Sequence, residues 1–84
     1  MDKNIMLEIL KKDGCTTAEA EKHLNRGSII YEDLEENFNI YMDEWGISGD
    51  DRADYENMVK NKVAAPDWGI VFYNDRYYYI SYCL

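Results

Sequence analysis

Proline, histidine and cysteine are scarce in this sequence. It has one proline, one histidine (His23) and two cysteines, Cys15 and Cys83, which stand far apart with no CxxC pair. A structural zinc site needs four Cys or His ligands at characteristic spacing, and these residues do not supply one. We therefore expect no metal and no cofactor. Reduced thiols are the expected state, while sequence distance alone leaves a Cys15–Cys83 disulfide open.

Catalytic motifs are also missing. There is no glycine-rich phosphate loop and no Ser or Cys nucleophile set beside a histidine and an acid. Residues 43–51 contain acids and glycines, but not at the spacing of an EF-hand calcium loop. General acid catalysis needs a carboxyl in a pocket that raises its pKa, and nothing in the sequence predicts such a pocket. We predict that the protein is not an enzyme.

Long hydrophobic runs are absent. The only apolar run near the N-terminus, in MDKNIMLEILKK, is short and flanked by lysines. It is unsuited to a signal peptide or a membrane span. A cytoplasmic location is the resulting expectation.

Basic residues are nearly missing from the middle of the chain. Residues 1–30 carry five acids and five bases, and residues 58–84 carry two acids and three bases. Residues 31–57 carry ten acids and one base, Arg52, so this segment has a net charge of −9 against −8 for the whole chain. Phosphate contact requires Lys and Arg, so direct binding to nucleic acid or to anionic membranes is disfavoured.

Apolar and acidic residues separate most clearly in residues 30–45. At about 100° per residue, the apolar side chains fall within roughly a third of the helical turn, and acids occupy the other side and the flank. The apolar set is Ile30, Tyr31, Leu34, Phe38, Tyr41, Met42 and Trp45. The pattern predicts one amphipathic helix with a core-facing side and a negative side.

Three further helices are predicted. Apolar residues on one side predict a helix over residues 4–12. Caps predict the other two, one after the capping box of Thr16 and Glu19 and one over residues 49–61 after the N-cap Ser48. The chain is thus predicted to be a single α+β domain over residues 1–84. About four short helices within residues 3–63 precede a C-terminal antiparallel β-hairpin, residues 68–83, that packs on the helices.

The hairpin signal is the clearest in the chain. Residues 68–73 and 76–82 read as strands, and Asn74-Asp75 reads as a two-residue turn. The expected pairs are Phe72 with Tyr77, Val71 with Tyr78 and Ile70 with Tyr79. Both faces of this hairpin are apolar. One covers the helical core, and the other is either packed by the N-terminal helices or left as an exposed aromatic surface.

The first two helices could suggest a DNA-binding helix-turn-helix. Their region is charge-neutral, however, and Glu19 and Glu21 would meet phosphates at the first turn of the recognition helix. A helical hairpin that serves packing is the better interpretation. His23, which lies on the second helix without a partner at ligand spacing, is interpreted as a surface or boundary residue.

The acidic helix predicts a protein-binding function. Six acids along about 21 Å of helix give one charge per roughly 3.5 Å, close to the charge spacing of one DNA strand. Such a helix could compete for a basic groove that holds nucleic acid. The expected partner-binding residues are Glu32, Glu35, Glu36, Asp43, Glu44, Asp50, Asp51 and Asp54, with Tyr78 and Tyr82 as aromatic anchors.

Three stretches carry a resemblance to small bacterial proteins. They are GCTTAEAEKHLNRGSIIYEDLEENF, MDEWGI and PDWGIVFYNDRYYYISYCL. With its short length and concentrated acid, the chain resembles the small acidic proteins of phages and mobile elements, a group that includes anti-CRISPR and anti-restriction inhibitors. The resemblance implies a stoichiometric inhibitor that occupies the nucleic-acid channel of a defence nuclease or blocks its conformational cycle.

An alternative function uses the terminal hairpin. A small regulatory or scaffold subunit, monomeric or homodimeric, would bind through the aromatic face or the edge of the hairpin. Tyr78 and Tyr82 would then carry the contact instead of the acids.

Overall fold

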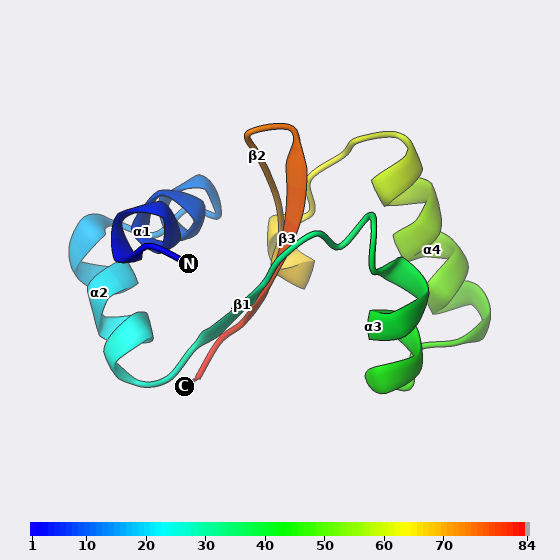
Figure 1. The fold of residues 1–84 in the computed structure, drawn as a ribbon, viewed down its shortest axis with the longest axis horizontal. Coiled ribbons are helices and arrows are strands. Elements are labelled where there is room, and N and C mark those ends of the chain that lie inside the picture. The colour runs from blue at the N-terminus through cyan, green and yellow to red at the C-terminus, as the bar shows by residue number, and fades with distance from the viewer. Residues whose placement is uncertain (84) are drawn as a thin grey trace.

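A central sheet separates two pairs of helices (Figure 1). The computed structural model describes residues 1–83. Within them the helices are α1 (Lys3–Lys12), α2 (Thr17–Asn25), α3 (Phe38–Glu44) and α4 (Gly49–Lys60), and the strands are β1 (Ile29–Tyr31), β2 (Ile70–Tyr73) and β3 (Arg76–Ser81), with a 3-10 turn at Pro66–Trp68. Helices α1 and α2 lie on one side of the sheet and α3 and α4 on the other. The predicted α+β class is confirmed.

Local capping fixes the N-terminal helices. The Asp2 side chain accepts a hydrogen bond from the backbone of Asn4 at the start of α1. At the start of α2, Thr16 and Glu19 form the predicted capping box, in which each side chain accepts from the other residue's backbone N–H. The hydrogen bond from the Thr16 backbone lowers the pKa of Glu19. Both helices thus begin where their sequence signals place them.

The prediction of one helix over residues 30–45 is wrong. Residues 29–31 form strand β1, residues 32–37 form a turn, and only Phe38–Glu44 is helical. Two β-branched isoleucines and a tyrosine favour the strand, which pairs antiparallel with β3 from Ile29 opposite Ser81 to Tyr31 opposite Tyr79. Asp33 then adopts a left-handed φ of 52°, which no α-helix can contain.

The predicted hairpin and its register are confirmed, but its first strand begins at Ile70 and not at residue 68, because Pro66–Trp68 forms a 3-10 turn. Strands β2 and β3 pair with Ile70 opposite Tyr79, Val71 opposite Tyr78 and Phe72 opposite Tyr77. Asn74 and Asp75 have φ of 51° and 61°, as a type I′ turn requires. Since β1 joins the other edge of β3, the strand order is β1-β3-β2 and β3 is central.

Both faces of the sheet are covered, which settles the alternative left open by the sequence. The face toward α1 and α2 buries Ile9, Leu10, Ala20, Ile30, Val71, Tyr78 and Ile80. The face toward α3 and α4 buries Leu34, Met42, Val59, Ile70 and Tyr77. Half-buried aromatic rings line the margin of the second cluster, among them Tyr41 and Trp45, stacked at 5.1 Å. The hairpin therefore has no free aromatic face.

Candidate functional site

The central segment presents most of its carboxylates to solvent. Two of the ten acids in residues 31–57 take part in ion pairs within the described chain, Asp33 and Asp43. The other eight are exposed: Glu32, Glu35, Glu36, Glu44, Asp50, Asp51, Asp54 and Glu56. We call these eight residues the acidic surface. Its charge is not neutralised by side chains of residues 1–83.

Two arginines bind carboxylates beside this surface. Arg52 donates to Asp43 at 2.8 Å and to the amide oxygen of Asn39 at 2.9 Å. Arg76, at the start of β3, donates to Asp33 at 2.7 Å. The hydrogen bond to Asp33 raises the pKa of Arg76, which keeps its guanidinium charged. Each arginine is already engaged, so neither offsets the acidic surface further.

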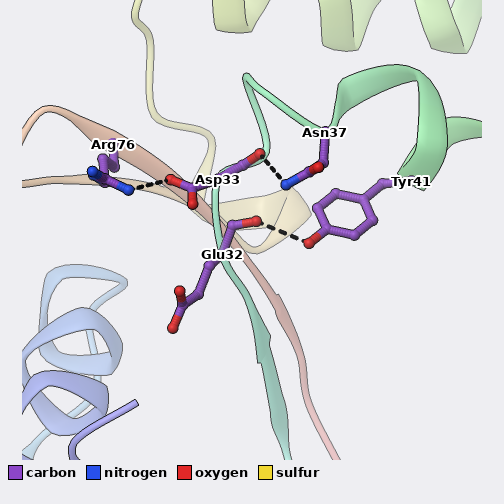
Figure 2. Close-up of polar contacts among 5 residues, drawn as sticks. All are labelled: Glu32, Asp33, Asn37, Tyr41 and Arg76. Atoms are coloured by element: carbon purple, nitrogen blue, oxygen red, sulfur yellow. Dashed lines mark hydrogen bonds and ion pairs between the residues drawn. The ribbon is translucent and has the colours of Figure 1, made fainter.

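Three polar contacts hold the turn between β1 and α3 (Figure 2). Besides the Arg76 pair, the Asn37 side-chain amide donates to the backbone oxygen of Asp33 at 3.3 Å. The Tyr41 hydroxyl donates to the backbone oxygen of Glu32 at 2.9 Å. The Glu32 carboxylate points away from all three contacts. The turn is thus fixed from within, while Glu32, Glu35 and Glu36 form no ion pair in residues 1–83.

The predicted acids come from three places and not from one helix. Glu32, Glu35 and Glu36 lie on the turn, Asp43 and Glu44 at the end of α3, and Asp50, Asp51 and Asp54 on α4. The straight row of six charges at the spacing of a DNA strand is therefore not formed. Asp50 and Asp51 lie in the first turn of α4, where the helix dipole stabilises their negative charges.

Tyr78 and Tyr82 do not form an accessible aromatic surface. Tyr78 is 8% exposed and belongs to the core beneath α1 and α2. Tyr82 is half-buried, its ring lies 4.8 Å edge-on to His23, and its hydroxyl donates to the Asp13 carboxylate. Burial raises the pKa of both tyrosines. These two residues hold the C-terminal strand against the helices.

The contact between Asp13 and Tyr82 has no sequence signal, because the pattern around Asp13 indicates only the end of a helix. Asp13 lies 69 residues before Tyr82. Burial raises the pKa of its carboxyl, against the lowering effect of the Tyr82 hydrogen bond. Cys15 Sγ lies 3.9 Å from the same hydroxyl, and Cys15 and Cys83 are both free thiols. The cluster joins chain segments that only the fold brings together.

Residues 1–83 contain no group of three or more His, Cys, Asp or Glu side chains arranged to hold a metal ion. No helix among them has the length and apolar character needed to cross a membrane. Comparisons of the chain with protein-family models, with curated proteins and with solved structures found no match.

Proposed function

We propose that this protein is a non-enzymatic binding module whose acidic surface engages a basic surface on a partner protein. The observation that supports the proposal is the set of eight exposed carboxylates without an ion pair in the described chain. Surfaces of one sign attract oppositely charged partners and speed their encounter. A partner with clustered Lys and Arg would supply the charges that the acidic surface lacks.

The partner we propose is a nucleic-acid-binding nuclease of a bacterial defence system, in the cytoplasm. Lysines and arginines that hold phosphates in such an enzyme would contact Glu32, Glu36 and Glu44 instead. The protein would then act as a nucleic-acid mimic, an inhibitor of the anti-CRISPR or anti-restriction type. Carboxylates on a turn and two helices replace the single charged helix as the mimicking surface.

DNA cleavage by purified RNA-guided and restriction nucleases tests this proposal. We expect stoichiometric inhibition by the native protein that weakens between about 0.1 M and 0.5 M NaCl, because salt screens exposed charges. The double variant Glu36→Lys with Glu44→Lys should lose inhibition, since neither carboxylate has an internal partner in the described chain.

The matched control changes two exposed acids on the opposite side of the sheet. Glu8→Lys with Glu21→Lys alters the net charge equally and leaves the acidic surface intact. Full inhibition by this control is expected. Equal loss in both variants, or inhibition by neither the native protein nor the control, would reject the proposal.

A second candidate function is a homodimeric scaffold subunit that pairs through a sheet edge. Strand β1 is an edge strand, and Ile29 on it is 53% exposed. Exposed edges with apolar residues favour pairing with a second strand. Sedimentation of the native protein and of Ile29→Lys tests it: a concentration-dependent dimer lost in the variant supports the scaffold, and a monomer in both rejects it.

A further inference from the structure

A groove runs between α3 and α4. Its volume is about 380 Å³, and its lining residues are Glu35, Phe38, Asn39, Glu56, Val59 and Lys60. Val59 is buried and Phe38 is half-buried, so both give the groove an apolar floor. Glu35 and Glu56 are exposed and form no ion pair in the described chain. An aromatic and aliphatic floor is thus combined with two free carboxylates.

This combination matches the chemistry of an arginine side chain. A guanidinium is planar and weakly hydrated, stacks on aromatic rings, and donates to carboxylates through several N–H groups. Its methylene stem can cover apolar surface while the charged head meets an acid. A lysine ammonium carries the same charge but lacks the planar face that Phe38 could contact.

The protein's own arginines show the same recognition, and Arg52 does so beside the groove. Arg52 binds Asp43 together with Asn39, and Asn39 also lines the groove. Arg76 binds Asp33 on the neighbouring turn. The groove has two carboxylates, Glu35 and Glu56, and no arginine of the described chain forms an ion pair with either one.

We infer that the groove binds an arginine side chain from a basic segment of the partner, an inference that rests on the proposed function. The arginine stem lies over Phe38 and Val59, and its guanidinium meets Glu35 and Glu56. Lys60 also lines the groove, where its ammonium competes with the incoming cation. Its removal therefore strengthens binding.

Titration with a short peptide of alternating arginine and glycine, followed by calorimetry and by amide NMR, tests the inference. The amide shifts should concentrate on groove residues, and the lysine version of the peptide should bind several-fold more weakly. Glu35→Gln with Glu56→Gln should lower affinity roughly tenfold, a difference of about 1.4 kcal/mol. Lys60→Gln should raise affinity.

Glu8→Gln with Glu21→Gln is the matched control, because both acids are exposed and lie on α1 and α2. It should change affinity less than twofold. Equal losses in the two double variants, shifts centred on residues 50–54, or equal binding of the lysine peptide would overturn the inference. The neutral glutamines preserve side-chain shape, and the NMR spectrum of each free variant verifies its fold.

The nuclease assay separates this inference from the proposed function. The two hypotheses separate if inhibition is lost in the Glu36→Lys, Glu44→Lys variant but retained in the Glu35→Gln, Glu56→Gln variant. That result would reject the groove as an arginine site and would still support the proposed function. Arginine binding by the groove without nuclease inhibition would support the groove as a site and reject the nuclease as partner.

Discussion

The two sides of the sheet are each covered by two helices but differ in what they expose. The side formed by α1 and α2 belongs to a segment with no net charge, and its core is mostly aliphatic. The side formed by α3 and α4 belongs to the segment of residues 31–57, whose net charge is −9, and places aromatic rings at the core margin. The α1 and α2 side combines a packed core with an exterior of no net charge. The α3 and α4 side combines a packed core with exposed acids that form no ion pair in the described chain.

This difference separates the residues that stabilise the fold from those that we propose for binding. Exposed acids that repel one another add nothing to folding. The exposed acids lie over a core whose central residues, such as Leu34 and Met42, are fully buried. The side with no net charge can then supply stability that does not depend on a partner.

The largest effects are expected from Leu10→Ala and Leu34→Ala, one on each side of the sheet. Both side chains are 0% exposed, and such truncations cost about 2–5 kcal/mol. Because both clusters pack on the same strands, each variant should lower the midpoint of a single unfolding transition. Urea unfolding followed by circular dichroism and by tryptophan fluorescence checks this. Separate transitions for the two probes would show that the sides fold independently.

The next largest effect concerns the turn that replaces the predicted helix. Asp33→Val should be less stable than Asp33→Gly by about 1–2 kcal/mol, because a β-branched residue resists the left-handed φ of 52°. Both variants lose the Arg76 ion pair, so it cancels from the difference. Thermal unfolding of the two proteins measures this gap. Equal stability would argue that residues 30–45 adopt a different backbone in solution.

Local physics explains what the sequence could predict. The capping box of Thr16 and Glu19 and the Asn74-Asp75 turn depend on neighbours within a few residues, so helix starts and hairpin register followed directly. Strand β1 depends on pairing with Ser81 and Tyr79, far along the chain. Its residues also fit the helical period of residues 30–45, so that period alone predicts a helix where the strand forms.

The candidate site was predictable in composition but not in arrangement. Exposure of Glu35 and Glu36 follows from their charge, whichever backbone carries them. Their separation from Asp50 and Asp51 onto different elements follows from the break at Asp33. The alternation of side chains in the hairpin places Tyr78 on a face, but only the tertiary packing of α1 and α2 buries that face.

A smaller effect compares the helix starts on the two sides. Thr16→Ala should destabilise by about 1 kcal/mol, because the threonine side chain accepts from the Glu19 backbone at 3.2 Å. Ser48→Ala at the start of α4 should cost only a few tenths, since Ser48 makes no capping side-chain hydrogen bond. Chemical denaturation compares them. A larger loss for Ser48→Ala would show that α4 is capped in solution as α2 is.

The smallest effect tests the half-buried carboxylate of Asp13, which joins the end of α1 to the C-terminal strand. Burial raises the pKa of Asp13 above its ordinary 3.8, so at neutral pH its ionisation opposes folding, and protonation removes that cost as pH falls through the raised pKa. Asp13→Asn should therefore raise Tm at pH 7 by more than it does near pH 4. The asparagine oxygen can still accept from Tyr82.

Tyr82→Phe is the companion variant: it removes the donor, leaves the Asp13 charge in place, and should lower Tm at pH 7. A stability gain for Asp13→Asn that is equal at both pH values would contradict the titration of Asp13 as its cause.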